Sequence, residues 1–562
     1  MMSTVIGIDL GTSTTEAAVI RNGVPVMVLN GEGEVVIPSA VGLDENGNYI
    51  MGEPAKERYL LEPERTAIEI KRKIGTEEKI YLGQKAHTPV ELSSMILRYV
   101  KEYASEYLGE EISRAVISVP AYFDDRQRQA TVEAGRLAGF QVERILNEPT
   151  AAALSYGLGH MEEESHILVY DLGGGTFDVT LLEMFGGVLE VKASSGDNKL
   201  GGKDFDERLM DYLIREFQAK YGINLRRDIH AMVKLKEKAE WCKKELSARD
   251  SCRVVIPFIA KVKDEPVALD ETVTVEKFES LIGDLVERTH HPIDVVLADS
   301  GLMPSEIDRV LLVGGSTRVP LISRDIEKYL GQSPSRAVNP DYAVAEGAAI
   351  QAGMMNGMIS REDGLIMTDV NPYTLGVRTW DGVTDDWMSV VIPRNVTIPV
   401  TRKETYYTSD DNQTRADIRV YQGESSMASH NHFLGEFQVQ GIPARPAGKE
   451  QIEVEFSYDL NGILQVAATI VSTHSTASIT INMMEGQERI DVSKWKEASG
   501  ASQFRSLIRR AERMMKKPEI REDSFVYDDL EEDVYLLKKA ILEDDMEAAR
   551  EIEEDLMDIL GE

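Results

Sequence analysis

The sequence predicts a multidomain protein: a duplicated α/β domain, then an antiparallel β-sandwich, then a short helical tail. Two similar hairpins predict the duplicated domain, V-I-G-I-D-L-G-T-S-T-T-E-A-A-V from Val5 and V-Y-D-L-G-G-G-T-F-D-V-T-L from Val169. Each combines an apolar strand, an Asp-Leu-Gly loop and a second apolar strand, and two copies in one chain indicate an internal repeat. Short alternating strands between Asn371 and Ile481 predict the sandwich, and helical apolar stripes after them predict the tail.

The charge and composition of the chain exclude several classes of protein. Lys and Arg number 62 against 96 Asp and Glu, giving a formal net charge of -34, which a nucleic-acid backbone would repel. Hydrophobic residues make up 42% of the chain, too many for a wholly disordered protein. The N-terminus shows no signal-like segment, and no apolar run approaches the length that spans a membrane. We therefore expect a cytoplasmic protein without nucleic-acid or membrane partners.

The loop of the second hairpin has the composition of a phosphate-binding turn. It contains Gly173, Gly174 and Gly175, framed by Asp171, Thr176 and Asp178. Glycines let another group approach the main chain, successive backbone N–H groups bind anions, and a flanking carboxylate suits a hydrated cation. This combination predicts a polyphosphate with Mg²⁺, although a flexible hairpin tip with solvated aspartates would have the same composition. The second copy, at Asp9-Leu10-Gly11, favours a nucleotide held between two halves.

Two stretches before residue 210 fit either a ligand contact or ordinary surface. Lys71 precedes the Ile74-Gly75 turn, and it is either one member of a basic surface run or a ligand of a γ-phosphate. The segment from Gly196 to Asp206 contains another glycine turn that could face phosphates.

Two later stretches are equally open. A predicted helix carries four polar residues on one face, which is either solvated or in contact with a ligand: Glu240, Lys243, Lys244 and Ser247. The buried strand that begins at Leu311 ends in Gly314-Gly315, which is a tight turn in either case.

The chain has only two cysteines, Cys242 and Cys252. Two cysteines are too few for a disulfide framework or a cysteine-rich metal site. Cys242 lies on the same predicted helix and is either redox-sensitive or a buried inert thiol.

Six motifs, in this order, resemble those of the DnaK (seventy-kilodalton heat-shock) chaperone family: I-G-I-D-L-G-T, V-P-A-Y-F-D-D-R-Q-R-Q-A-T, N-E-P-T-A-A-A-L, D-L-G-G-G-T-F-D-V, L-V-G-G-S-T-R-V-P and N-P-D-Y-A-V-A-E-G-A-A. The resemblance runs from Val5 to about Ile481. It implies an actin-like (ribonuclease-H-like) ATPase domain at residues 1–358, an interdomain linker at 359–370, a substrate-binding sandwich at 371–484 and a shortened helical lid at 485–562. The short lid, and a short segment between Lys71 and Pro120, resemble the HscC-like branch of the family.

The resemblance also implies roles for individual residues of the ATPase domain. Lys71 would orient water and stabilise the γ-phosphoryl group, while Glu148, with Asp171 and Thr176, would position the nucleophile. Asp9 and Asp171 would hold a hydrated Mg²⁺ and also K⁺. The other implied contacts with ATP or ADP are Gly11, Thr12, Ser13, Gly173, Gly174, Gly175, Gly201, Gly202, Lys203, Glu240, Lys243, Lys244, Ser247, Gly314, Gly315, Ser316, Arg318 and Asp341. Of these, Lys244 and Arg318 would lie on opposite sides of adenine, and Asp341 near the cation.

A second set of implied roles concerns the polypeptide substrate. Ala416 and Ile418 would line a pocket for an apolar side chain, while Met388 and Ser409 would arch over an extended peptide. Strand-like hydrogen bonds plus a side-chain pocket are a common way to bind such a segment.

The remaining implied roles concern coupling between the domains. Pro120 and Arg128 would relay the nucleotide state towards the linker, and Arg144 and Asp369 match positions used by J-domain co-chaperones. The linker itself is apolar at Leu365-Ile366. Because an exposed linker should be polar, we expect this segment to dock on the ATPase domain when ATP is bound.

Together these observations predict an ATP-dependent molecular chaperone that binds extended apolar polypeptide segments. A J-domain co-chaperone is expected as a partner, and the need for a nucleotide-exchange factor is left open. A small-molecule kinase or a filament-forming ATPase of the actin-like superfamily is the alternative. The sandwich that follows Asp369 argues against both, because neither would use it.

Overall fold

In the computed structural model, the described residues are 4–160, 163–262, 265–335, 337–359, 366–380, 382, 384–480, 495, 498, 501–515, 524–542, 549–550, 552–553 and 556–557. The chain divides into two compact units, residues 1–484 and residues 485–562. Leu365, predicted to dock as part of the linker, lies outside the described residues.

The first half of the duplicated domain is built on a six-stranded sheet. Its elements are β1 (Val5–Leu10), β2 (Thr14–Arg21), β3 (Val24–Met27), β4 (Ile37–Pro38), β5 (Ala40–Leu43), β6 (Tyr49–Met51), α1 (Glu53–Tyr59), β7 (Thr66–Ile68), the 3₁₀ helix η2 (Ile70–Lys73), β8 (Ile80–Leu82), β9 (Lys85–His87), α2 (Pro89–Leu108), β10 (Arg114–Val119), α3 (Asp125–Leu137), β11 (Gln141–Asn147) and α4 (Glu148–Gly157). The strand order is β11-β10-β1-β2-β3, with β4 paired to β2. Helices α2 and α3 share one buried cluster with the sheet, which includes Ile8, Leu97 and Ala134.

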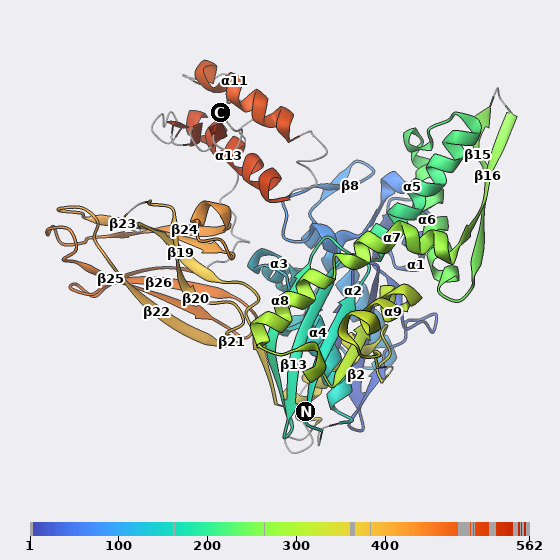
Figure 1. The fold of residues 1–562 in the computed structure, drawn as a ribbon, viewed down its shortest axis with the longest axis horizontal. Coiled ribbons are helices and arrows are strands. Elements are labelled where there is room, and N and C mark those ends of the chain that lie inside the picture. Colours follow the sequence, from blue (N-terminus) through green and yellow to red (C-terminus); the bar gives the residue numbers. More distant parts are fainter. Residues whose placement is uncertain are drawn as a thin grey trace. The chain divides into compact units, whose positions relative to one another are not determined.

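The second half repeats this plan. Its elements are β12 (Ser165–Leu172), β13 (Phe177–Phe185), β14 (Val188–Asp197), α5 (Gly202–Tyr221), α6 (Ile229–Leu246), β15 (Ser251–Val262), β16 (Glu265–Thr274), α7 (Val275–Glu287), α8 (His290–Ser300), β17 (Arg309–Val313), α9 (Pro320–Leu330), α10 (Ala343–Met355) and β18 (Ile366–Val370). The short strand β21 (Thr397–Ile398), from the sandwich segment, adds to the edge of its sheet. The strand order is β17-β12-β13-β14-β18-β21, and β15 and β16 form a separate hairpin beside α5, α6 and α7 (Figure 1). As in β1 and β2 of the first half, β12 is antiparallel to the next strand and parallel to a later one. The predicted duplication is therefore confirmed.

Each half supplies one helix that packs on the sheet of the other half. The small residues Ala151 to Ala153 of α4 share a buried cluster with second-half strands. Ala345 and Ala349 of α10 share another with Ala18 and Ile20 of β2 in the first half. The two helices also touch each other, because a Cβ at Gly347 of α10 would overlap the main chain of Ala151. The packing of small residues keeps the backbones of the two helices close.

The two cysteines lie where α6 packs against β15. Cys242 is fully buried and Cys252 is 5% exposed. Their thiol groups hydrogen-bond to each other, and burial raises the pKa of both. A buried thiol with a raised pKa forms little of the thiolate that reacts, so the structure favours the inert alternative.

We expect both cysteines to resist a soluble disulfide reagent in the native protein. Labelling should be at least about a hundredfold slower than for an exposed thiol, because the thiolate is scarce and enclosed. The measurement is the number of thiols that react per chain, before and after unfolding in urea. Two reactive thiols after unfolding provide the control, and rapid stoichiometric labelling of the folded chain would contradict the expectation.

The chain from 371 to 480 forms the predicted β-sandwich. Its strands are β19 (Leu375–Thr379), β20 (Trp387–Ile392), β22 (Val400–Tyr407), β23 (Arg415–Gln422), β24 (His432–Gln440), β25 (Gln451–Tyr458), β26 (Leu464–Ile470) and β27 (Ser475–Thr480). They form two antiparallel four-stranded sheets, β20-β19-β23-β24 and β22-β25-β26-β27, which face each other (Figure 1). Alternation places Ile452, Val454 and Phe456 in the core between the sheets, as the sequence pattern predicts.

The second unit contains the predicted helical tail. Its long helices are α11 (Ala501–Met514) and α13 (Ser524–Leu542). One buried cluster joins the apolar stripe of α11, including Phe504 and Ile508, to that of α13, including Leu537 and Ile541. The two stripes thus pack against each other.

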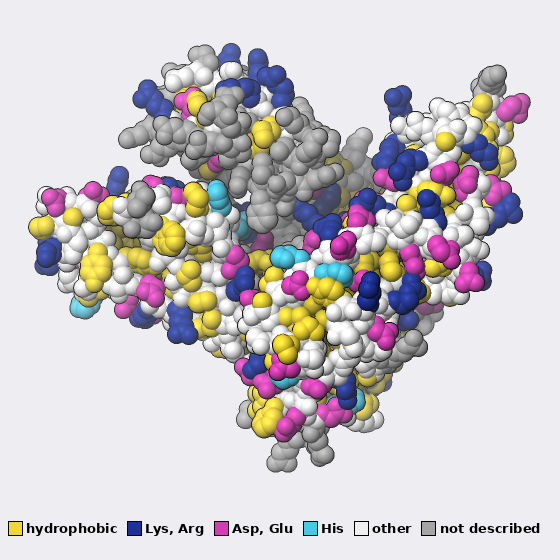
Figure 2. All heavy atoms as spheres, in the orientation of Figure 1, with side chains coloured by type: hydrophobic (Ala, Val, Ile, Leu, Met, Phe, Trp, Pro, Cys, Tyr) yellow, Lys and Arg dark blue, Asp and Glu magenta, His cyan; other side chains and the backbone are white. Residues whose placement is uncertain are grey.

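The surface carries charges of both signs. Figure 2 shows acidic and basic side chains interspersed on the visible face, with apolar side chains recurring over the sandwich. Among the residues that the structure describes, no helix is both long and apolar enough to cross a lipid bilayer.

Candidate functional site

The loops of the two hairpins face each other. A Cβ at Gly174 would overlap the side chain of Ser13, and one at Gly175 would crowd Thr12 and Arg72. A larger residue at either position would require the side chain of Ser13 or Arg72 to move. The sequence predicted a ligand between the two hairpins, and the structure brings their loops together.

Two more glycine turns, Gly201-Gly202 and Gly314-Gly315, contact the loop that follows β12. The amide of Gly202 donates to the carbonyl of Gly173 at 3.0 Å, and a Cβ at Gly201 would overlap the backbone of Gly174 and Gly175. Directly after Gly314-Gly315, the Ser316 hydroxyl donates to the Gly173 carbonyl at 2.7 Å.

The Gly314-Gly315 turn is held against β12 by Gly314. Gly314 adopts a φ of 81°, and a Cβ there would overlap the main chain of Leu172. Gly315, next to it, lies close to Asp341. The glycine turns at Gly201-Gly202 and Gly314-Gly315 therefore converge on the hairpin loop that contains Gly173.

Carboxyl groups are concentrated around these loops. Lys71, on η2, is buried and forms a hydrogen-bonded ion pair with Glu148 at the start of α4. Burial raises the pKa of Glu148, Asp9 and Asp171, and the charge of Lys71 opposes the rise in each case. Burial, together with Glu148, also raises the pKa of Asp178 to about 7.

Glu16 is a further carboxyl group here that the sequence interpretation missed. It lies directly opposite Asp9 in the antiparallel pairing of β1 with β2, and it is 3% exposed. Residues directly opposite each other in such a pair lie on the same face of the sheet. Burial and the neighbouring Asp9 raise the pKa of Glu16 well above its ordinary value. A lone glutamate in an apolar strand beside an aspartate was the available signal.

The site fits a hydrated cation that is bound together with phosphate. Among the described residues, no group of three or more His, Cys, Asp or Glu side chains is arranged to hold a metal ion by itself. Even so, the charge of Lys71 acts on the carboxyl groups of Asp9, Glu148 and Asp171 alike. Mg²⁺ usually keeps several waters and takes the rest of its ligands from one or two carboxylates and from phosphates. This chain supplies such carboxylates.

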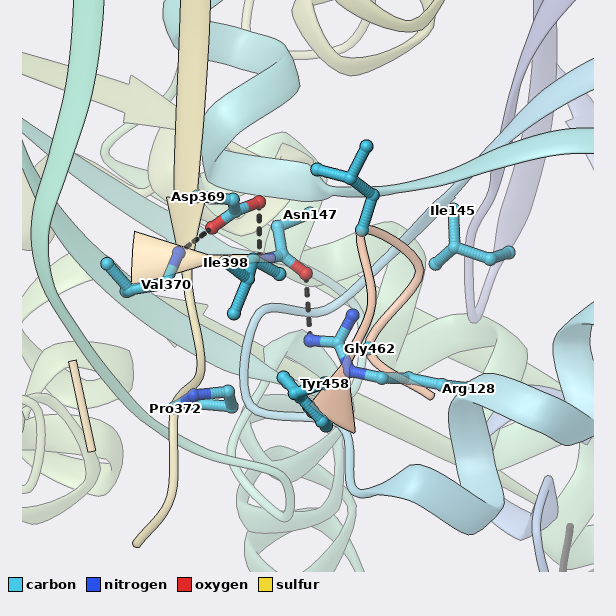
Figure 3. A pocket seen from close by; sticks show the side chains of 10 residues that line it. Arg128, Ile145, Asn147, Asp369, Val370, Pro372, Ile398, Tyr458 and Gly462 are labelled. Carbon is cyan, nitrogen blue, oxygen red and sulfur yellow. Dashed lines mark hydrogen bonds between the residues drawn. The ribbon is translucent and has the colours of Figure 1, made fainter. Parts of the chain in front are cut away.

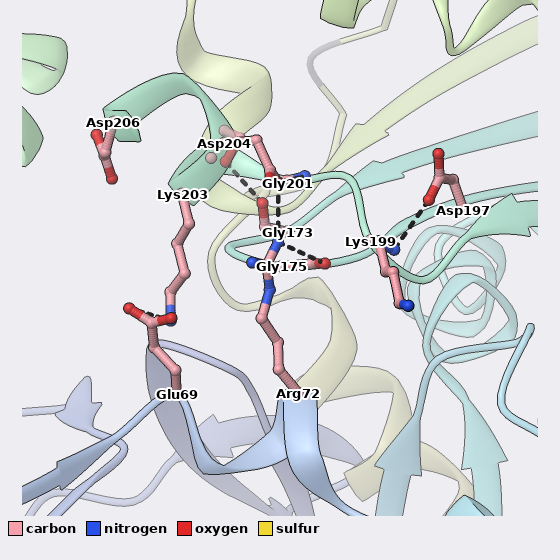
Figure 4. Close-up of polar contacts among 12 residues, drawn as sticks. Glu69, Arg72, Gly173, Gly175, Asp197, Lys199, Gly201, Lys203, Asp204 and Asp206 are labelled. Carbon is pink, nitrogen blue, oxygen red and sulfur yellow. Dashed lines mark hydrogen bonds and ion pairs between the residues drawn. The ribbon is translucent and has the colours of Figure 1, made fainter. Parts of the chain in front are cut away.

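Ion pairs join the two halves beside the glycine loops (Figure 4). Glu69, from the first half, lies 3.0 Å from the Lys203 ammonium of α5. Arg72 pairs with Asp204 at 2.8 Å and also donates to the carbonyl of Gly175. Burial, with a smaller contribution from the charge of Lys236, lowers the pKa of Lys203 to about 6. Lys203, expected to contact nucleotide, is thus also a contact between the halves.

Three of the four polar residues predicted on one helix face lie on α6 and the fourth, Ser247, caps its C-terminus, but they do not act alike. Lys243 turns towards α5, where it donates to the Gly202 carbonyl and to Asp206. Lys244 is exposed and pairs with Glu240 at 2.6 Å. Burial acts to raise the pKa of Glu240, but the charge of Lys244 and its hydrogen bond contribute to a final value of about 2. The Ser247 hydroxyl donates to the carbonyl of Lys243 at 3.2 Å.

Arg318 and Asp341 form an ion pair beside the Gly314-Gly315 turn. The sequence interpretation gave them separate roles, one on adenine and one near the cation. The pair fixes the guanidinium group of Arg318 in place.

A family model described as Hsp70 protein matches residues 5–560. The chain belongs to the Hsp70 family. Hsp70 proteins are ATP-dependent chaperones and ATPases that bind ATP or ADP with Mg²⁺ and act on unfolded polypeptides with co-chaperones. The match does not favour the kinase or filament alternatives, and the HscC-like branch stays a prediction.

In this Hsp70 protein the linker residues 366–370 form strand β18 on the ATPase domain. β18 pairs with β14 in parallel and with β21 of the sandwich side in antiparallel. The side chain of Ile366 is 65% exposed, so its main chain, rather than the predicted apolar contact, holds it. Met367 and Val370 pack on the ATPase core instead.

Asp369 ends a chain of hydrogen bonds that includes Arg128 (Figure 3). The Asn147 amide donates to Asp369 at 2.9 Å, and the Arg128 guanidinium donates to Asn147 at 2.8 Å. Arg144 donates to Gln351 of α10, and the charge of Asp369 acts on it. Asn147 was missed in the sequence, although it immediately precedes the predicted catalytic Glu148.

A second chain of contacts passes through the turn that follows Pro120, which is buried after β10. In that turn, the Tyr122 amide donates to Asp178 at 3.0 Å. The carbonyl of Tyr122 accepts a hydrogen bond from Tyr373, at the start of the sandwich, and the two rings lie 4.4 Å apart. Neither tyrosine was singled out in the sequence.

The predicted peptide-binding residues are only partly brought together. Ala416 and Ile418 lie on one face of β23 and pack with the sandwich core. Ser409 is exposed in the loop after β22. Met388 is 3% exposed and packs with Tyr421 and Ala428, and its role over a bound peptide stays a prediction.

Proposed function

We propose that this Hsp70 protein hydrolyses ATP between the two halves of its ATPase domain and thereby controls how tightly the sandwich holds an extended apolar polypeptide. One observation carries the proposal. Asn147 and Glu148 are consecutive residues, and the first contacts the linker residue Asp369 while the second contacts Lys71. A movement of Glu148 during hydrolysis would therefore shift its neighbour Asn147 and change the contact between Asn147 and Asp369.

The proposed roles at the reacting end follow from charge and position. Lys71 orients the attacking water and stabilises negative charge on the γ-phosphoryl group. Glu148, Asp171 and Thr176 position that water, and Asp9 and Asp171 hold the waters around the cation. When bound, Mg²⁺ neutralises phosphate charge, and K⁺ is proposed to sit beside it. The glycine turns that converge here would cradle the phosphates with their amides.

At the other end of the nucleotide, α6 and the turn after β17 would hold adenosine. Glu240 and Ser247 can bond ribose or base edges, and the stem of Lys244 can lie along the ring. Arg318, held by Asp341, presents a planar group suited to stacking on adenine from the opposite side.

Two contact chains support coupling between this site and the sandwich. One runs from Glu148 through its neighbour Asn147 to Asp369, and the other runs from Asp178 through Tyr122 to Tyr373. Both begin at carboxyl groups beside the phosphate loops and end at the linker or just after it. The arrangement of β18 described above corresponds, in this proposal, to the ATP-bound state. Arg144 and Asp369 are the proposed contacts for a J-domain co-chaperone.

Exposed aromatic side chains support peptide binding by the sandwich. Trp380 and Trp387 are 63% and 41% exposed. The main chain of Trp387 forms an isolated β-bridge with that of Met427, whose side chain is also exposed. Large exposed apolar side chains that gather on one domain commonly mark a binding surface. These residues are proposed to contact the client together with Ala416, Ile418 and Ser409.

We expect a labelled apolar peptide to leave the ADP-bound protein quickly, with ATP accelerating its release by less than about tenfold. The apolar stripes of α11 and α13 pack on each other, so little of the tail is left to close over a client. A lid acts mainly on the dissociation rate. Stopped-flow release in ADP and in ATP measures both rates, with a charged peptide of equal length as the control.

Three outcomes separate the parts of this proposal. Fast release in ADP with a modest effect of ATP supports it. Very slow release in ADP with a large effect of ATP would show a working lid and contradict the expected weak closure. No binding of the apolar peptide in either state would contradict the chaperone function proposed for the sandwich.

A further inference from the structure

Asp125 is buried at the contact between the ATPase domain and the sandwich. It is the first residue of α3, and its side chain is fully enclosed. The Tyr458 hydroxyl, at the end of β25, donates to Asp125 Oδ1 at 3.3 Å. The other carboxyl oxygen, Oδ2, is buried and has no hydrogen-bond partner.

The cation nearest to Asp125 is committed elsewhere. Arg128, one turn along α3, donates to the carbonyls of Phe123 and Ala121 and to the side chain of Asn147. Its guanidinium therefore donates its hydrogen bonds on the side of the linker, where the charge of Asp369 also acts (Figure 3).

The other charged groups that face Asp125 are acidic. Asp124 caps α3 by accepting from the amide of Gln127, and Asp459 follows Tyr458 in the turn of the sandwich. Both act to keep Asp125 uncharged. Burial is the largest cause, and together with these groups it raises the pKa of Asp125 to about 8, although the charge of Arg128 opposes the rise.

The enclosure of Asp125 depends on the sandwich. The turn after β25 lies against the ATPase domain, where the Asn461 side chain accepts from the amide of Ile145 at 3.1 Å. A Cβ at Gly462 would overlap the side chain of Arg128. If the sandwich leaves, the start of α3 meets water, and a carboxylate there is favoured by the helix N-terminus.

We propose that docking of the sandwich on α3 takes up one proton at Asp125, so that a fall in pH favours the docked arrangement. The inference rests on the docking that is part of the proposed function, and it adds a control of that docking. A buried carboxylate that accepts no hydrogen bond from a cation is less stable than the neutral acid. Docking and protonation of Asp125 therefore favour each other.

The sign of the effect follows from the two states. The pKa of Asp125 is about 8 when docked and near its ordinary value of 3.8 when exposed, so the docked state binds more protons between these values. Docking is then strongest at low pH and weakens as the pH rises towards 8. We expect the docking equilibrium to change by at least about tenfold between pH 6 and pH 8.

The test measures docking in the full chain by energy transfer between two dyes. Exposed Glu207 on α5 and exposed Lys449 of the sandwich are replaced by cysteine for labelling, since the native thiols are buried. The signal is recorded with ATP and with ADP at pH 6, 7 and 8. Asp125→Asn is the test variant, and Asp250→Asn, at an exposed position of the ATPase domain, is the matched control.

In the parent and in Asp250→Asn, we expect docking to weaken as the pH rises. In Asp125→Asn, docking should persist at pH 8, and most of the pH dependence should disappear. Tyr458→Phe removes the hydroxyl that donates to the charged carboxylate, so it should weaken docking at pH 8 more than at pH 6.

Equal pH dependence in Asp125→Asn and the parent would overturn the proton linkage, as would a parent signal that pH does not change. A signal that responds to pH through Asp125 but not to ATP would support the linkage and contradict the nucleotide coupling of the proposed function. The two ideas can therefore fail separately.

Discussion

Replacing Lys71 with alanine is expected to slow single-turnover ATP hydrolysis by about a thousandfold or more. Lys71 is the cation paired with Glu148 beside the phosphate loops. Phosphoryl transfer depends almost entirely on positioning and on charge stabilisation in the transition state, and both would be lost with this ammonium group. ATP binding should stay within about tenfold, or 1.4 kcal/mol, because the glycine turns and α6 are unchanged.

The measurement is phosphate release after mixing excess enzyme with ATP, alongside a separate binding titration. Lys73→Ala is the matched control, because Lys73 lies on the same 3₁₀ helix with a side chain that is 41% exposed. It should hydrolyse ATP at the parent rate. Normal hydrolysis by Lys71→Ala would remove Lys71 from the mechanism.

Replacing Asp369 with asparagine is expected to abolish most of the effect of ATP on peptide release. Asp369 is buried, accepts from Asn147 at 2.9 Å and faces the charges of Arg128 and Arg144. Removal of one charge from a buried, hydrogen-bonded set weakens an interaction by roughly 2–3 kcal/mol, which is enough to shift docking of the linker by a factor of about 30 to 140.

The ratio of peptide dissociation rates in ATP and in ADP reports this change. It should fall towards one in Asp369→Asn. Asp385→Asn is a suitable control, since this aspartate lies in the sandwich with a side chain that is 81% exposed. If the ratio in Asp369→Asn matched that of the parent, β18 would not transmit the nucleotide state.

The sequence was most informative for features that are formed within one short segment. The two Asp-Leu-Gly hairpins, the glycine turn at Gly201 and the alternating strands of the sandwich each show their structure within about ten residues. Local patterns of this kind depend on backbone geometry and strand periodicity, which short segments fully determine.

Contacts between distant segments could not be predicted in this way. Asp125 meets Tyr458 across 333 positions, and Asn147 meets Asp369 across 222. Each of these residues, considered alone, is equally compatible with an ordinary position on the surface. Met388 shows the same limit, because its burial depends on Tyr421 of a different strand.

Glu16 is a different kind of omission. Its partner Asp9 is only seven positions away, and the β1–β2 hairpin was predicted correctly. Counting the antiparallel register from the loop would have placed the two carboxyl groups side by side. Here the sequence held the information, and the register had to be worked out to find it.

The exchange of helices between the two halves also bears on how the chain folds. When the first 160 residues leave the ribosome, the face of β1 that carries Gly7 is still bare, because Ala349 of α10 covers it. Almost 200 more residues must be synthesised before that helix arrives. Contacts over such a separation in sequence form slowly, and until then apolar surface stays open to aggregation. During its own synthesis, a protein that acts on unfolded polypeptides is thus itself an incompletely folded chain with exposed apolar surface.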